Sequence, residues 1–166
     1  MGFFRWLFRK NERIENSAIE HSSKGDFTIN PKSKKISRMK GGGHGQENID
    51  FLESIGFQYN IIKEYDNGVR IGNVPLHKEV SKRTGINQSW FPKDWDRKDI
   101  FKAGKYVSRH ERKAPDGIQV YTRYKGVNVG IIRTNGKVST IYPTKIQKEG
   151  GKNGYKRNWK KSKWHD

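Results

Sequence analysis

The 166-residue sequence contains no cysteine, and it also has few acidic side chains and no long apolar run. The absence of cysteine excludes disulfide bonds, thiolate zinc sites, iron–sulfur clusters and a cysteine nucleophile. No apolar stretch approaches the roughly 20 residues that a membrane-spanning helix needs, so we expect no stable membrane insertion. Only 17 Asp and Glu oppose 35 Lys and Arg, which leaves a net charge of +18. Such a surplus favours a polyanionic partner, and nucleic acid is the first candidate.

Leucine is scarce as well, with three residues against 16 isoleucines, and a chain rich in isoleucine and aromatic residues favours strands. Hydrophobic periodicity predicts helices over 11–21, 47–55 and 96–107. The expected strands span 57–65, 69–74, 88–91, 118–125, 127–133 and 137–142, with Asn-Gly turns before the second and the last. The polar, lysine-rich stretch 22–40 is expected to be a loop. Helices followed by mostly antiparallel strands predict the α+β class.

Composition divides the chain into three parts. Residues 1–14 form a basic and apolar extension, 15–146 a folded domain, and 147–166 a basic tail that contains Tyr155, Trp159 and Trp164. The first ten residues are too short for a signal-peptide core, and we interpret them as a frayed or tethering terminus. A contact with a membrane surface is the alternative interpretation of this extension. The tail is expected to bind the substrate backbone rather than to take part in chemistry.

Ligands for a catalytic metal are not clustered in the sequence. The eight Asp and nine Glu are scattered, and Asp94, Asp96 and Asp99 are interpreted as charges favoured by the dipole at a helix start. The five histidines lack the H-E-x-x-H spacing of zinc enzymes. We therefore expect neither a metal nor a cofactor. Three histidines in polar, basic stretches are interpreted as surface residues: His77, His110 and His165.

Cleavage of RNA needs no metal, because RNA carries its own nucleophile. The 2′-hydroxyl attacks the adjacent phosphate if one group removes its proton and another protonates the leaving 5′-oxygen. Imidazole suits both tasks, since its ordinary pKa of about 6.5 lets it hold or release a proton near neutrality. His44 follows Gly42 and Gly43, which allow the backbone to approach a phosphate with its amides pointing at it. A flexible loop with an incidental histidine remains open for His44, as does a purely structural role for His21 at a helix end.

Four motifs in order resemble the bacterial EndoU nuclease family over about residues 15–146. They are EHSSKGDF at 20–27, GGGHG at 41–45, SWFPKDW at 89–95 and VSTIYPT at 138–144. The resemblance implies a barnase-related α+β core and a ribonuclease that leaves a 2′,3′-cyclic phosphate without an obligatory metal. In bacteria, it also implies the toxin module of a contact-dependent or secreted system.

The resemblance implies roles for individual residues of this chain. His21 and His44 would be the acid/base pair. Tyr142 would stack on or orient a base or ribose, and Thr140 would bond the substrate. Ser89, at the start of its motif, would contact phosphate or base. Without the resemblance, a Thr and a Tyr on a strand are ordinary sheet residues.

The catalytic lysine of the family has no counterpart at the expected position beside the short strand 88–91. Either Lys82, Arg83 or Lys93 substitutes for it, with Lys82 as the favoured one, or the role of the lysine has been lost in this chain. Arg83 and Lys93 are then expected, together with Gly42 and Gly43, to contact the substrate.

These observations predict a metal-independent endoribonuclease that acts as a toxin on cellular RNA, with tRNA as one candidate. We expect a secreted or delivered effector that works in the target-cell cytoplasm and is neutralised by an acidic cognate immunity protein. The alternative is a non-catalytic basic protein that binds RNA or DNA, which the charge and the aromatic tail also favour. A cationic membrane-active protein is a third interpretation, and hairpins and capped helices fit it poorly.

Overall fold

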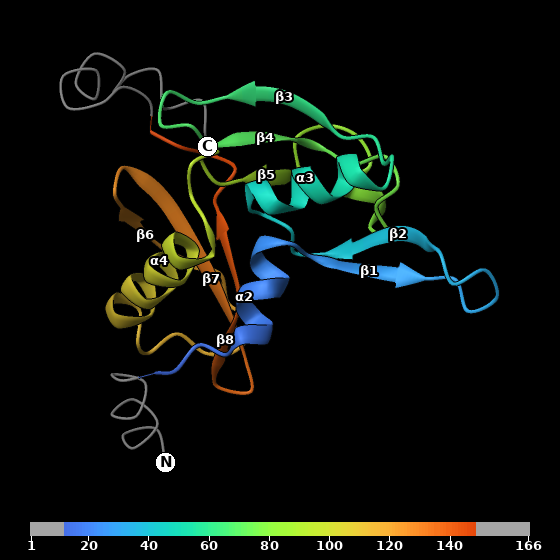
Figure 1. The fold of residues 1–166 in the computed structure, drawn as a ribbon. Helices are drawn as coiled ribbons and strands as arrows, with labels where there is room; N and C mark the ends of the chain where they lie inside the picture. The colour runs from blue at the N-terminus through green and yellow to red at the C-terminus, as the bar shows by residue number, and fades with distance from the viewer. Residues whose placement is uncertain (1–11, 149–166) are drawn as a thin grey trace.

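The computed structural model describes residues 12–148, which form three α-helices, a short 3-10 helix and eight strands (Figure 1). The helices are α2 (Asn16–Ser23), α3 (Gln46–Ser54), η1 (Val80–Lys82) and α4 (Arg97–His110). The strands are β1 (Asp26–Ile29), β2 (Ile36–Gly41), β3 (Asn60–Glu64), β4 (Arg70–Asn73), β5 (Gln88–Trp90), β6 (Val120–Tyr124), β7 (Val127–Thr134) and β8 (Lys137–Pro143). They pair antiparallel into three small sheets, β1-β2, β3-β4-β5 and β6-β7-β8. The predicted α+β class is confirmed.

The larger core lies between the sheet β6-β7-β8 and the helices α2 and α4 (Figure 1). Helix α4 begins at a capping box, in which the Asp96 side chain accepts from the Asp99 amide and the Asp99 carboxylate accepts from the Asp96 amide. These two reciprocal bonds satisfy amides that a helix start leaves unpaired. The inward face of α4 carries Ile100, Ala103 and Val107, as the periodicity predicts, whereas the prediction that Phe101 also faces inward is wrong, because this side chain is exposed.

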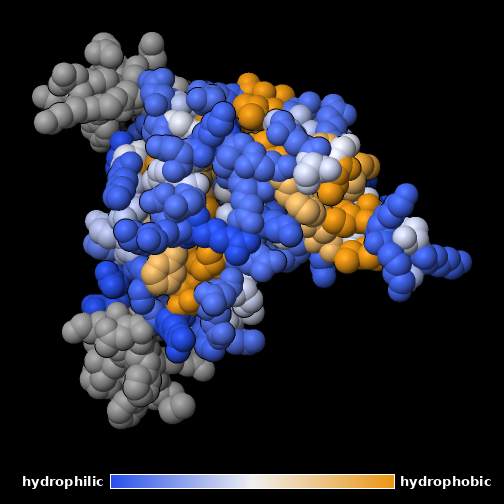
Figure 2. Space-filling model, viewed as in Figure 1, coloured by the Kyte–Doolittle hydropathy of each residue, from blue (hydrophilic) through white to orange (hydrophobic). Residues whose placement is uncertain are grey.

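A second, smaller core lies between α3 and the sheet β3-β4-β5. Its buried members are Met39, Ile49, Leu52, Val74 and Trp90. Strand β5 lies at the edge of this sheet and also contacts β8, so it connects the two halves of the molecule. On the face shown in Figure 2, hydrophilic side chains cover most of the surface and leave several apolar areas between them. No helix among residues 12–148 is long and apolar enough to span a membrane.

The prediction of a loop over 22–40 is wrong for most of that stretch, which forms the β1-β2 hairpin. Two register shifts interrupt the pairing, and Met39 is the one side chain of the two strands that is fully buried. The sequence therefore lacks the alternation that marks a half-buried strand.

The packed chain extends past both predicted domain boundaries. Near the start, the Glu12 carboxylate accepts three bonds from Arg133, at 2.9, 3.0 and 3.3 Å, and one from the Val138 amide at 2.8 Å. Near the end, Gln147 is buried and its side chain bonds the backbone of Asn128. The predictions for residues 1–10 and for Tyr155, Trp159 and Trp164 fall outside the described residues.

Candidate active site

The two candidate histidines come together because the loop before His44 runs along the end of α2. The Gly43 amide donates to the carbonyl of His21 at 2.9 Å, and the His44 amide donates to the carbonyl of Ser22 at 2.6 Å. Strand β8 is fixed to the same helix end, since the Ile141 amide donates to the Ser22 hydroxyl at 2.9 Å. The helix end, the loop and β8 thus meet at one place, although they are far apart in the sequence.

Glycine is required in this loop because the backbones approach so closely. Gly42 has φ +64°, and a Cβ on it would lie 2.1 Å from the His21 carbonyl oxygen. A Cβ on Gly43 would lie 2.5 Å from the amide nitrogen of the Asn48 side chain. The sequence predicts that the amides of this loop point at a phosphate. The Gly43 amide instead donates to the His21 carbonyl within the fold. These glycines act by packing the loop against α2 and α3.

His21 is oriented by a carboxylate on one side and faces a hydroxyl on the other. Its Nδ1 lies 2.6 Å from Oδ2 of Asp26, the first residue of β1. Its Nε2 lies 3.2 Å from Oγ1 of Thr140 on β8. The His21 side chain is partly exposed to solvent. The Asp26 carboxylate fixes the orientation of the His21 ring.

His44 is in the opposite situation, since only 5% of the residue is exposed and no carboxylate contacts it. Its Nδ1 donates to the backbone carbonyl of Ser89 at 2.7 Å. The carbonyl has no proton to give, so Nδ1 carries the proton and Nε2 of the neutral ring is free to accept one. Burial, together with the positive charge of Lys82, lowers the pKa of His44 to about 3.

Ser89 lies behind His44 rather than in open solvent. Its hydroxyl donates to the carbonyl of Pro143 at 2.7 Å and lies 3.5 Å from Nδ1 of His44. The residue is buried, and it connects β5 to the end of β8. The structure therefore gives Ser89 a role in holding His44, in addition to the substrate contact expected from the sequence.

Tyr142 provides an aromatic surface beside His44. The two ring centroids lie 5.9 Å apart, and the Tyr142 hydroxyl donates to Oε1 of Gln119 at 3.0 Å. The ring lies over Gly130 of β7, where a Cβ would come within 2.4 Å of the ring carbon that carries the hydroxyl. Burial raises the pKa of Tyr142 to about 12, so its hydroxyl remains protonated at neutral pH. A protonated, fixed ring suits stacking and hydrogen bonding rather than proton removal.

Of the three candidate cations, Lys82 is the one placed with the histidines. Its positive charge is among the causes that lower the pKa values of His44 and His77. Its own pKa is lowered by burial, and its ammonium group lies 3.8 Å from Glu79. The Arg83 guanidinium instead donates to the backbone carbonyls of His77 and Lys78 at 2.8 and 3.1 Å, which holds the loop before η1.

His77 is fully buried, so the interpretation of this residue as a surface histidine is wrong. Its Nδ1 accepts from the Glu79 amide at 2.9 Å, while Nε2 has no hydrogen-bond partner. Burial and the charge of Lys82 lower the pKa of His77 to about 4. His110 is exposed, as expected, and His165 lies outside the described residues.

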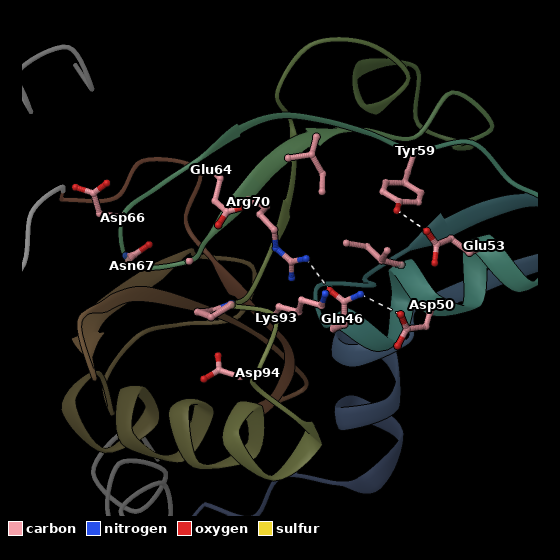
Figure 3. A pocket seen from close by; sticks show the side chains of 14 residues that line it. Gln46, Asp50, Glu53, Tyr59, Glu64, Asp66, Asn67, Arg70, Lys93 and Asp94 are labelled. Carbon is pink, nitrogen blue, oxygen red and sulfur yellow. Dashed lines mark hydrogen bonds between the residues drawn. The ribbon is translucent and has the colours of Figure 1, made fainter.

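Lys93, the third candidate, lies in a different hollow from the histidines. A groove of about 930 Å³ opens between α3 and the strands β3 and β4 (Figure 3). Arg70 and Lys93 are its cations, and its carboxylates outnumber them: Asp50, Glu53, Glu64, Asp66 and Asp94. Such a surface repels a phosphate backbone, so this groove is a poor substrate site for a nucleic acid. No group of three or more His, Asp or Glu among residues 12–148 has the geometry to hold a metal ion.

Sequence reasoning missed three residues that build the site: Asp26, Gln119 and Gly130. Asp26 stands in the first motif, and its spacing of five residues from His21 was the available signal. Gln119 and Gly130 have no signal in the sequence, because their roles depend on the pairing of β6, β7 and β8.

Residues 15–145 match the protein-family model described as bacterial EndoU nuclease. This match covers more than half of the chain and includes every residue of the histidine site described above. A search of curated proteins and a search of solved structures each gave no match.

Proposed function

Because the chain belongs to the bacterial EndoU nuclease family, and is therefore an enzyme, we propose that its histidine site cleaves RNA by attack of the 2′-hydroxyl on the neighbouring phosphate. The products would be a 2′,3′-cyclic phosphate and a free 5′-hydroxyl. One observation carries the proposal. Two histidines meet in opposite electrostatic environments, one neutral and buried and one paired with a carboxylate. That difference is what an acid and a base acting together require.

His44 is the proposed general base. Its Nδ1 proton is held by the Ser89 carbonyl, so Nε2 accepts the proton of the 2′-hydroxyl. In the free protein its pKa of about 3 makes it a weak base. A phosphodiester in the site adds a negative charge that opposes the effect of Lys82, and so raises the pKa of His44 toward the value that catalysis needs.

His21 is the proposed general acid. A proton on Nε2 passes to the 5′-oxygen as its bond to phosphorus breaks, while Asp26 holds the ring through Nδ1. Thr140, which faces the same Nε2 at 3.2 Å, marks the position that a substrate oxygen would take. Asp26 is thus a positioning residue, because it acts on the substrate through His21.

Lys82 and Tyr142 complete the proposed site. The Lys82 charge stabilises the additional negative charge of the pentavalent phosphate, which is the task of the family's lysine. The Tyr142 ring, fixed over Gly130, offers a flat surface on which a base stacks.

The decisive experiment is cleavage of RNA in excess EDTA, followed by identification of the product ends. We expect cleavage without metal, ends that carry a 2′,3′-cyclic phosphate, and resistance of an RNA with a 2′-O-methyl group at the cut site. Cleavage of DNA or of the methylated RNA would exclude the 2′-hydroxyl mechanism. Binding of RNA without any cleavage would favour the non-catalytic binding protein instead.

We further propose that the enzyme is a toxin, delivered into the cytoplasm of a target cell and acting on cellular RNA such as tRNA. Its net charge of +18 supports rapid association with RNA in any cell that makes it. A producing cell then needs an inhibitor, and the same field steers an acidic immunity protein to the histidine site. We expect its carboxylates to face Lys82, Arg83 and the loop 32–35.

This proposal is tested by expressing the chain with and without the acidic protein encoded by a neighbouring reading frame. Growth arrest with tRNA cleavage, relieved by the neighbour, is the expected result. Association of the two proteins should slow steeply as salt rises, since exposed charges are screened over about 8–10 Å at physiological ionic strength. An inhibitor that leaves the histidine site open to RNA would contradict this account of neutralisation.

A further inference from the structure

The β1-β2 hairpin joins the two candidate catalytic histidines. Its first residue, Asp26, bonds His21, and its last, Gly41, pairs with Asp26 and leads into the loop that carries His44. The two strands form a sheet of their own, to which Met39 adds a single bridge with His77, and their far end reaches away from the body of the molecule (Figure 1). With a rise of about 3.3 Å per residue, β2 alone spans about 20 Å. The hairpin therefore extends from the histidine site over a length that covers several nucleotides of RNA.

Positive charge is concentrated on this hairpin. Between residues 27 and 41 the sequence has no Asp or Glu, and all five basic side chains are exposed: Lys32, Lys34, Lys35, Arg38 and Lys40. The ion pairs found among residues 12–148 involve other cations of the chain. Figure 2 shows the corresponding hydrophilic surface at the far end of the hairpin. These charges are therefore available to phosphates.

The half of the hairpin near the body is held firmly. The Phe27 ring packs edge-on against Phe51 of α3, with centroids 4.8 Å apart. Met39 is fully buried, and its backbone bonds the segment after β4 on both sides, with Leu76 as acceptor and Lys78 as donor. The hairpin cannot swing about its attachment without breaking these contacts.

The far end is also ordered, in a way that displays its lysines. The Asn30 side chain accepts from the amides of Lys32 and Ser33, at 2.8 and 3.2 Å. The Asn30 backbone bonds Lys34 and Lys35, each at 2.8 Å. The turn thus fixes the backbone at three lysines, which lowers the conformational entropy lost when they bind an anion.

We infer that the β1-β2 hairpin is an arm that holds the RNA backbone on one side of the cleavage site. The enzyme would then act on extended or structured RNA far better than on short oligonucleotides. This inference rests on the proposed function, because it takes the histidine site as the place of cleavage. A basic arm that starts at the two catalytic histidines fixes the path of the strand, so phosphate contacts far from the cut place the scissile phosphate between them.

The test compares two substrates and two triple variants of the full chain. The arm variant is Lys32→Gln with Lys34→Gln and Lys35→Gln. The control is Lys98→Gln with Lys102→Gln and Lys125→Gln, which removes the same charge from exposed positions on α4 and the β6-β7 turn, away from the hairpin (Figure 1). The substrates are a dinucleotide and a longer oligoribonucleotide, and kcat/KM is measured for each at several salt concentrations.

We expect the arm variant to lose about 10- to 100-fold in kcat/KM on the longer RNA and to cleave the dinucleotide as the wild type does. Its salt dependence on the longer RNA should become shallower by about two in the log–log slope, since each single-strand phosphate contact contributes about 0.7. The control should change both measures much less. Affinity for an uncleavable 2′-O-methyl RNA should follow the same order.

Three outcomes would overturn the inference: unchanged cleavage of the longer RNA, an equal loss on the dinucleotide, or an equal loss in the control variant. Unchanged cleavage of the longer RNA would indicate that the hairpin binds a protein partner and not RNA. An equal loss on the dinucleotide would mean that the lysines affect the histidines directly. An equal loss in the control variant would mean that only the net charge matters. Failure of the proposed function has a different signature, because the wild-type protein would then cleave neither substrate.

Discussion

The two walls of the histidine site contain the same side chain in contrasting surroundings. On the wall formed by α2, β1 and β8, His21 is partly exposed and bonded to the Asp26 carboxylate. On the wall formed by the glycine-rich loop and β5, His44 is buried, bonded to a neutral carbonyl and influenced by Lys82. Burial beside a cation favours the neutral form of His44, whereas the Asp26 carboxylate holds the His21 ring through a hydrogen bond. Under the proposed mechanism, this difference in surroundings is the reason for taking His44 as the base and His21 as the acid.

The groove lined by carboxylates can be compared with the histidine site as a place for substrate. It has a volume of about 930 Å³, yet its charges oppose the substrate of a nuclease. The histidine site is recognised instead by the convergence of titratable groups whose pKa values are displaced by burial and, for His44, also by the charge of Lys82. Shape alone would have led to the wrong face of this molecule.

The largest expected effect is loss of either histidine. His44→Ala and His21→Ala should each lower kcat by about 10²- to 10⁴-fold with little loss of RNA affinity, because each removes one proton carrier. The measurement is single-turnover cleavage combined with binding of an uncleavable RNA. Wild-type activity in either variant would remove that histidine from the mechanism.

The two walls are distinguished by a substrate whose leaving group needs no acid. In an RNA with sulfur in place of the bridging 5′-oxygen, the thiolate leaves without being protonated. His21→Ala should then recover most of its activity on this RNA, and His44→Ala should not. Recovery in His44→Ala and not in His21→Ala would mean that His44 is the acid and His21 the base.

Removal of the cation beside His44 should have the next largest effect. Lys82→Gln is expected to lower kcat by about 10²- to 10³-fold, the usual cost of losing one group that stabilises charge in the transition state. It should also raise the pKa of His44, since the Lys82 charge lowers it. Lys93→Gln, in the groove with the carboxylates, is the matched control and should leave kcat nearly unchanged. If the two variants lose equal activity, Lys82 has no special place in the site.

A smaller effect is expected from the carboxylate on the His21 wall. Asp26→Asn keeps an oxygen near Nδ1 but removes the charge, so we expect about a tenfold loss of kcat with KM little changed. Asp26→Ala removes the hydrogen bond as well and should lose more. On the RNA with the sulfur leaving group, both variants should approach the wild-type rate. Failure of this rescue would show that Asp26 acts by holding the hairpin rather than His21.

Local features of the fold were predictable, and features that depend on distant contacts were not. The capping box of Asp96 and Asp99 and the turn at Asn135 and Gly136 are encoded within a few residues, and both are present. The two histidines were identified through motifs. The β1-β2 hairpin was missed, because its few inward side chains are recognised only against α3 and the segment after β4.

The protonation states of the site are also beyond the sequence. His77 is buried, and its pKa is therefore low, at about 4. The residues next to His77 in the sequence give no indication of this burial. Likewise, nothing around His44 in the sequence indicates that its neighbours are the Ser89 carbonyl and Lys82. Motifs in the sequence therefore point to the candidate histidines, while their surroundings and pKa values are known only from the tertiary structure.

The smallest expected effect concerns stability, and it tests whether His44 and His77 are uncharged in the folded protein. The pKa values of His44 and His77 are about 3 and about 4 in the folded protein, against 6.5 for the unfolded chain. Below pH 6.5 the unfolded state therefore binds more protons, and stability must fall as pH falls. Between pH 7 and pH 5 each histidine should cost about 2 kcal/mol of unfolding free energy.

Urea unfolding at a series of pH values measures this dependence. His77→Asn keeps an acceptor for the Glu79 amide and should remove about half of the decline below pH 6.5, while the exposed His110→Asn should leave the decline as it is in the wild type. His77 makes a cleaner test than His44, because it has no assigned part in the chemistry and cleavage can confirm that the variant is folded. A decline that is equally steep in His77→Asn would mean that His77 takes up its proton in the folded state. The surroundings of Lys82 would then tolerate a second positive charge, on His77. The argument that His44 is neutral, in contrast to His21, would lose its basis.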